Sequence, residues 1–165
     1  MLPIVLSPNA GRVGLSGRGP AFENRRQWLV ASGVDPEIVS VEGQLSGLKL
    51  LFVAGHSEAD SSILARKARA LDILVNVEDV PILCDFHVPA LIRRGDLILT
   101  VSTGGRAPGL ARMVREWLDA RFGSEWAGYL DQASDARLAW RAEGARAEEL
   151  SRRTREMVAE RNWLA

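Results

Sequence analysis

Two acidic side chains follow directly after an apolar run near the middle of the chain. Residues 73–77 form the run, and Glu78 and Asp79 come next. A carboxylate at the mouth of a parallel strand can act as a general acid or base when its surroundings adjust its pKa. Ligands of open α/β sheets bind where strands end in polar or glycine-rich turns. Positions 78 and 79 are therefore candidates for acid–base chemistry.

A second apolar run ends in a similar way. Leu97–Val101 leads into Ser102, Thr103, Gly104 and Gly105, and a helix is predicted after Pro108. Glycines in such a turn would allow backbone N–H groups to face an anionic ligand. Arg106 and Arg112 could add charge-assisted contacts, although surface arginines more often lie in solvent or pair with nearby acids.

A glycine pair near the N-terminus indicates a dinucleotide loop. Gly17-Arg18-Gly19 follows a weak strand, Arg12–Leu15, and opens a helix at Pro20. The first glycine would permit a tight turn, and the second would let a pyrophosphate approach the helix N-terminus. Phe22 stands where the full fingerprint has a small residue, and a lone GxG more often simply marks a turn.

Glu42 is the residue that would choose between the two nicotinamide cofactors. It is predicted to end the second strand, 38–41, where an acid can bind a ribose 2′-hydroxyl and favour NAD over NADP. A solvent-facing acid at a strand end explains the residue equally well, so both interpretations stay open.

The remaining pattern predicts an α/β fold. Residues 2–6 are an edge strand or lead-in, the first helix runs to about Ala31, and Gly33 stops it. Further elements are a buried strand at 49–54, a helix at 58–71, a strand at 73–77, a short helix at 88–94 closed by Gly95, a strand at 97–102, an amphipathic helix after Pro108, and two helices beyond Phe122. Strands that alternate with helices in the first half predict a parallel sheet.

Composition excludes several classes of protein. The chain has 165 residues, 47% of them hydrophobic, and its 21 basic and 21 acidic residues cancel, which gives no sign of nucleic-acid binding. Its single cysteine, Cys84, rules out a disulfide framework within the chain and fits a reducing compartment. No signal peptide or membrane span is recognised, so a cytoplasmic location is expected. His56, His87 and Cys84 do not form a cluster of metal ligands, so no metal site is predicted.

The stretch 75–116 resembles the precorrin-2 dehydrogenase family of siroheme synthesis. Five groups of residues carry the resemblance at matching spacing. They are Asn76, Val77, Asp79 and Pro81; Phe86 and Pro89; Arg93, Arg94 and Gly95; Ser102 to Gly105; and Pro108, Leu110, Ala111 and Arg112. The segment around the glycine loop continues the match more loosely, and the resemblance fades after about Phe122.

The resemblance implies an organisation and a reaction. The expected fold is a reduced Rossmann-like parallel sheet that binds NAD (1–85), a dimerisation region (86–122) and a small C-terminal helical domain (123–165). The reaction is oxidation of precorrin-2 to sirohydrochlorin by NAD+, in a homodimer; some members also insert Fe2+. The family usually has more chain between Glu42 and the 49–54 strand. A sirohydrochlorin ferrochelatase, or a tetrapyrrole-binding protein with a degenerate NAD site, is therefore the alternative.

The resemblance also implies roles for individual residues. Asp79 matches the essential aspartate, and Thr103 matches a position that lines the tetrapyrrole pocket. Predicted cofactor-binding residues are Ser16, Gly17, Arg18, Gly19, Pro20, Glu42, Ala54, Gly55, Asn76 and Val77. Predicted substrate-binding residues are Asn76, Phe86, Ser102, Thr103, Gly104, Gly105 and Arg106.

Overall fold

The computed structural model describes residues 2–164, and the chain divides after Val88 into two compact units. In the first unit, four parallel strands form a sheet in the order β2-β1-β3-β4. The strands are β1 (Arg12–Gly17), β2 (Glu37–Ile38), β3 (Leu48–Ala54) and β4 (Leu74–Val77). The parallel α/β prediction is therefore confirmed.

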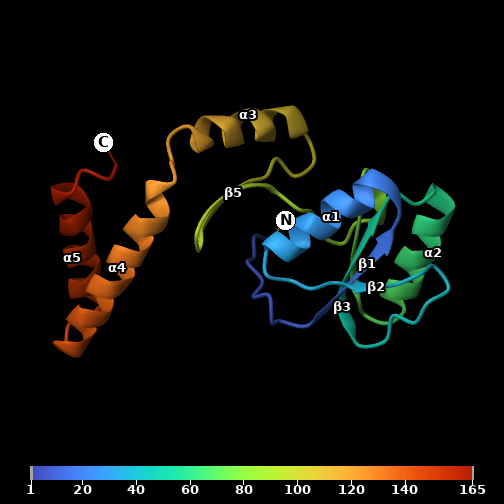
Figure 1. The fold of residues 1–165 in the computed structure, drawn as a ribbon, viewed down its shortest axis with the longest axis horizontal. Helices are drawn as coiled ribbons and strands as arrows, with labels where there is room; N and C mark the ends of the chain where they lie inside the picture. Colours follow the sequence, from blue (N-terminus) through green and yellow to red (C-terminus); the bar gives the residue numbers. More distant parts are fainter. Residues whose placement is uncertain (1, 165) are drawn as a thin grey trace. The chain divides into compact units, whose positions relative to one another are not determined.

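Two helices cover the two faces of this sheet (Figure 1). Helix α1 (Gly19–Ala31) packs Leu29 against Leu15 and Phe52. Helix α2 (Glu58–Arg69) packs Leu64 and its alanines against the opposite face, which includes Leu51 and Val53. Successive residues of β3 thus point to opposite layers, and both layers are apolar, as expected for a strand covered on both sides.

The connection from β2 to β3 is a loop without a helix. Its apolar side chains Val39 and Leu45 are buried with those of α2, and Lys67 of α2 donates hydrogen bonds to the carbonyl oxygens of Val41 (2.8 Å) and Gly43 (3.0 Å). The loop therefore fills part of the layer that a crossover helix would otherwise occupy.

The second unit joins a hairpin to three helices. Strands β5 (Ala90–Arg94) and β6 (Leu97–Val101) pair antiparallel, and they are followed by α3 (Pro108–Asp119), α4 (Glu125–Ala142) and α5 (Ala147–Glu160). Arg94 ties the hairpin to the end of α3: its guanidinium donates to the carbonyl oxygen of Phe122 (2.6 Å) and to the carboxylate of Asp119 (2.6 Å). A cation suits the C-terminal end of a helix, where carbonyl oxygens are left without helical partners.

Three sequence predictions need correction. Residues 88–94 form no helix, because Ala90–Arg94 pairs with Leu97–Val101 across the tight turn at Gly95, whose φ is +57°. Residues 2–6 form no strand and are exposed. The second strand is Glu37–Ile38 rather than 38–41, because the chain leaves the sheet after Val39 donates to the carbonyl oxygen of Leu15 (3.0 Å).

Within residues 2–164, the structure contains no helix that is both long enough and apolar enough to cross a bilayer.

The burial pattern of the sheet predicts unequal costs for two leucine truncations. Leu51 is fully buried in the centre of β3, whereas the side chain of Leu74 in β4 is 47% exposed. Leu51→Ala should lower the free energy of unfolding of this unit by about 2–5 kcal/mol, because it removes buried contacts and leaves a cavity.

Leu74→Ala is the matched control and should cost under about 1 kcal/mol, since nearly half of Leu74 already faces water. Native-state hydrogen exchange of the β1 and β3 amides measures the stability of this unit. Equal losses in the two variants would contradict the described core.

Candidate functional site

The carboxyl ends of β1 and β3 approach each other closely at the point where the strand order reverses. A Cβ atom at position 17 would lie 1.9 Å from the carbonyl oxygen of Ala54, and one at position 55 would lie 2.1 Å from that of Arg18. The Arg18 N–H donates to the Ala54 carbonyl oxygen at 3.2 Å. Glycine is thus required at positions 17 and 55, at the switch point where open α/β sheets bind ligands.

The loop that follows β1 fits a dinucleotide phosphate. Gly19 has a φ of +72°, and a Cβ there would meet nothing within 4 Å, so the backbone is open to an approaching group. Helix α1 begins at this residue without a side-chain cap and without an acid in its first turn. Its first N–H groups are therefore free to donate to an anion, which the helix dipole also favours.

Three acids follow β4, and two of them are paired. Glu78 lies 3.6 Å from the guanidinium of Arg25 on α1. The carboxylate of Asp85 accepts from the N–H of Val75 (3.0 Å) and from Arg69 (2.9 Å). Asp79 is exposed, and within residues 2–88 its carboxylate has no hydrogen-bond or ion-pair partner. Of the three carboxylates, that of Asp79 is left available for chemistry.

Arg25 stabilises the turn that presents Asp79. Its side chain is mostly buried and lies over the rings of Trp28 (5.4 Å) and Phe52 (5.5 Å). Burial lowers the pKa of the Arg25 guanidinium, and the negative charge of Glu78 opposes that effect. The Glu78 N–H also donates to the Val53 carbonyl oxygen at 2.9 Å, so residue 78 is held by both its backbone and its side chain.

Asp79 itself has a left-handed backbone with a φ of +60°. Aspartate tolerates this region better than most residues, at a cost of about 1 kcal/mol or more. The turn persists because Val80 donates to the Val77 carbonyl oxygen (3.4 Å) and the thiol of Cys84 donates to the same oxygen (3.1 Å). Strain is thus located at the residue that the sequence predicted to be catalytic.

Two of the predicted ligand-binding side chains have structural partners. The amide of Asn76 is buried and donates to the carbonyl oxygen of Phe86 at 2.9 Å. The ring of Phe86 packs edge-on against Phe52 at 5.3 Å. Asn76 therefore holds the segment after β4 against the strand, and Phe86 extends the apolar layer beneath α1. Contact of either side chain with a ligand stays a prediction.

Glu42 is exposed but does not lie at a strand end. Strand β2 stops at Ile38, and Glu42 follows in a turn closed by the N–H of Gly43 donating to the Ser40 carbonyl oxygen (3.1 Å). The carbonyls on both sides of Glu42 are held by Lys67, which fixes its backbone.

All the predicted cofactor residues except Glu42 share one edge of the sheet. The register pairs Gly17 with Ala54 and Val53 with Val77, which places Ser16–Pro20, Ala54–Gly55 and Asn76–Val77 at the carboxyl edge. Asp79 follows Val77 on the same edge. Spacing in the sequence had suggested these positions separately, and the parallel register brings them together.

The Ser102–Arg106 turn belongs to the second unit. Gly104 and Gly105 have left-handed backbones, with φ of +66° and +77°, and a Cβ at Gly105 would meet nothing within 4 Å. The Thr103 hydroxyl accepts from the N–H of Ala107 at 3.2 Å, just before α3 begins. The turn is an exposed, glycine-rich backbone surface at the start of a helix.

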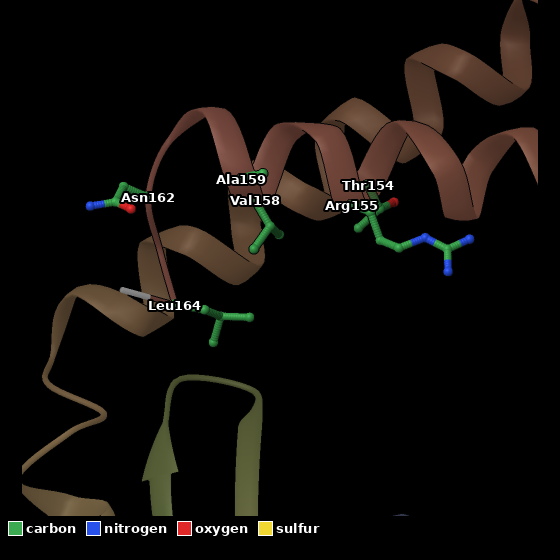
Figure 2. Close-up of a pocket in the computed structure, with 6 residues that line it drawn as sticks. All are labelled: Thr154, Arg155, Val158, Ala159, Asn162 and Leu164. Atoms are coloured by element: carbon green, nitrogen blue, oxygen red, sulfur yellow. The ribbon is translucent and has the colours of Figure 1, made fainter.

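A shallow hollow runs along α5 and contains none of the predicted site residues (Figure 2). It is lined by Thr154, Arg155, Val158, Ala159, Asn162 and Leu164. The Thr154 hydroxyl donates to the carbonyl oxygen of Leu150 (2.8 Å), as a helical threonine commonly does. The hollow offers no acid–base or nucleophilic group. Among residues 2–164, no three His, Cys, Asp or Glu side chains gather where they could hold a metal ion.

Sequence reasoning missed the roles of Arg25 and Glu78. Phe22, Arg25 and Leu29 recur at i, i+3 and i+7, so a charged residue on the buried stripe of a helix was the available signal. Its partner could not be identified from spacing, because the pair joins α1 to the end of β4.

Comparisons with known proteins agree with the fold of the first unit. The family model described as "Putative NAD(P)-binding" matches residues 4–90. The siroheme synthase of Methylobacillus flagellatus is 44% identical over 72 residues, which cover 44% of this chain and 15% of that protein. The siroheme synthase of Pseudomonas putida is 32% identical over 142 residues, which cover 72% of this chain and 31% of that protein. The chain thus spans less than a third of the length of these curated relatives.

A solved structure has the same fold. The protein described as SirC, precorrin-2 dehydrogenase, superimposes with a TM-score of 0.77 at 16% identity, covering 100% of this chain and 93% of that one. At this identity the likeness concerns the fold.

The matched model spans more than half of the chain and includes the whole carboxyl edge of the sheet. The protein therefore belongs to the putative NAD(P)-binding family, and the predicted relationship to siroheme synthases and precorrin-2 dehydrogenases is confirmed.

Proposed function

We propose that the protein oxidises precorrin-2 to sirohydrochlorin with NAD+ as the hydride acceptor. The observation that carries the proposal is the free carboxylate of Asp79, on the same sheet edge as an uncapped glycine loop. Relatives named siroheme synthase and a structural neighbour named precorrin-2 dehydrogenase support the choice of substrate. The single cysteine is free, which suits a reducing, cytoplasmic setting for this chemistry.

In this proposal, different residues of the chain bind the cofactor, bind the substrate and accept the proton. When bound, the nicotinamide takes a hydride from the macrocycle. The macrocycle must also lose a proton, and Asp79 accepts it, so that precorrin-2 and NAD+ give sirohydrochlorin, NADH and a proton. Gly19 and the first N–H groups of α1 bind the pyrophosphate. We also propose that the Ser102–Arg106 turn binds carboxylates of the substrate, a role that rests on the matched motif.

Removing the Asp79 charge should abolish turnover and spare cofactor binding. Asp79→Asn keeps a residue that tolerates a left-handed backbone but cannot accept a proton. We expect the rate of NADH formation from precorrin-2 to fall by about 100-fold or more, as for loss of a general base. The affinity for NAD+, measured by calorimetry, should stay within about twofold, because the phosphate-binding loop is untouched.

Asp72→Asn is the matched control, since Asp72 is also an exposed aspartate with a positive φ of 56° in this unit. It should turn over like wild type. Undiminished oxidation by Asp79→Asn would reject the proposed role. Wild-type protein that inserts Fe2+ into sirohydrochlorin but neither binds NAD+ nor oxidises precorrin-2 would establish the ferrochelatase alternative instead.

NAD rather than NADP is the proposed cofactor, and Glu42 is the residue proposed to select it. A carboxylate near the ribose hydrogen-bonds the 2′-hydroxyl and repels a 2′-phosphate. Wild-type protein should bind NAD+ about tenfold more tightly than NADP+, since two like charges about 4 Å apart repel by about 1–4 kcal/mol at a protein surface.

Glu42→Gln should lower the ratio of the dissociation constants for NADP+ and NAD+, mainly by improving the binding of NADP+. Calorimetric titrations with both cofactors measure this ratio. Asp35→Asn removes a charge before β2 and should leave the ratio unchanged. A ratio unaffected by Glu42→Gln would assign the selection to another residue.

We also propose that the protein is a homodimer that buries the apolar face of α3. Leu110, Met113 and Trp117 lie on one face of this helix and are 55%, 67% and 55% exposed. A cluster of neighbouring exposed apolar side chains differs from hydrophobic residues scattered singly over a surface and is typical of an interface.

A charge on that face should weaken the dimer. Met113→Glu would place a carboxylate in the buried interface, and we expect the dimer dissociation constant to rise by at least about tenfold, given the cost of burying an unpaired charge. Sedimentation velocity over a concentration series measures this change. Arg112→Glu introduces the same side chain on the opposite face of α3 and should leave the sedimentation coefficient as in wild type. A wild-type protein that is monomeric at micromolar concentration would overturn the proposal.

A further inference from the structure

The two loops at the switch point are joined by a hydrogen-bonded pair of side chains. The hydroxyl of Ser16 lies 2.9 Å from Nε2 of His56. Ser16 is the last residue before Gly17-Arg18-Gly19 and is fully buried, whereas His56 follows Gly55 between β3 and α2. The pair therefore connects the start of the proposed phosphate loop to the loop that follows β3.

The burial of Ser16 determines what this pair can do. Because its hydroxyl is fully covered, Ser16 cannot donate directly to a bound cofactor, although it is one of the predicted cofactor-binding residues. A buried hydroxyl without a partner is costly, and His56 supplies that partner. Ser16 thus acts on a cofactor only through the position of the backbone that follows it.

His56 is itself held in a fixed place. The backbone before it is confined by the close approach of Gly55 to the Arg18 carbonyl oxygen. The next residue, Ser57, is the N-cap of α2, and its hydroxyl accepts from the Asp60 N–H (3.2 Å). Nδ1 of the imidazole is buried without a partner in residues 2–164, so Nε2 carries the whole polar function of the ring. A rigidly mounted imidazole is well suited to fix the loop that it contacts.

We propose that His56 is a positioning residue for the nicotinamide cofactor, acting through Ser16 on the Gly17-Arg18-Gly19 loop. Without the bond, Ser16 would seek another partner, and the loop would lose part of its preorganisation for the pyrophosphate. This inference rests on the cofactor half of the proposed function and not on the identity of the tetrapyrrole.

Calorimetric titration of the full-length protein with NAD+ tests the inference. His56→Ala and Ser16→Ala should each raise the dissociation constant for NAD+ by about 5- to 10-fold, the effect of losing one hydrogen bond. The double variant should be no weaker than the worse single variant, because both changes break the same bond. His56→Gln places an amide near the position of Nε2 and should restore the affinity to within about twofold of wild type.

Ser57→Ala is the matched control for a loss of stability. It removes the cap of α2 next to His56 but leaves the Ser16–His56 pair in place, so it should lower the melting temperature without changing the affinity for NAD+. The inference is overturned if His56→Ala binds NAD+ like wild type, if Ser57→Ala weakens binding as much, or if the effects of His56→Ala and Ser16→Ala add.

The outcomes also separate this inference from the proposed reaction. Wild-type protein that binds NAD+ in a His56-dependent way but leaves precorrin-2 unchanged would reject the reaction and keep the positioning role. Normal oxidation of precorrin-2 by the wild type, together with an unchanged NAD+ affinity in His56→Ala, would keep the reaction and reject the positioning role. Wild-type protein that binds no NAD+ would reject both the role and the oxidation.

Discussion

The close contact between the ends of β1 and β3 is the constraint on which the rest of the first unit depends. The two strands are neighbours, but β1 leads outward to β2 and β3 leads outward to β4. Their following segments therefore diverge to opposite faces and leave a crevice between them. The backbones can meet there because positions 17 and 55 lack a Cβ. The Gly17-Arg18-Gly19 loop and the N-terminus of α1 follow directly from this junction, and Asp79 lies on the same edge of the sheet.

The small size of the sheet does not leave its core open. A longer connection between β2 and β3 would normally bring a helix to cover the sheet. Here Val39, Leu45 and Leu48 are buried directly against α2, and Lys67 satisfies the carbonyls of the turn. The unit thus keeps the strand order of a nucleotide-binding fold with a shorter chain. What changes is the position of Glu42, which lies within this loop rather than at a strand end.

Periodicity predicted most of the elements, and its failures have physical causes. The helix predicted at 88–94 was a short apolar run, which helix and strand patterns share, and its partner strand lay beyond the turn at Gly95. Residues 2–6 had a strand-like composition but no sheet edge to join, because Asp85 bonds to the backbone of Val75 along the outer edge of β4 and β2 is only Glu37–Ile38. Asp79 could be predicted because its motif is local. The Ser16–His56 and Arg25–Glu78 contacts could not, because they depend on which strands become neighbours.

The acids after β4 show how the fold assigns different roles to similar side chains. Glu78 is held by a mostly buried arginine, and Asp85 is used to satisfy the backbone of β4. Each of these contacts fixes one end of the segment in which Asp79 adopts its left-handed backbone. A strained residue persists only where its surroundings determine its conformation, and both neighbouring acids contribute to that determination. The paired carboxylates therefore account for the position of the unpaired one, and their charge is neutralised nearby, so that Asp79 carries the remaining exposed negative charge of the turn.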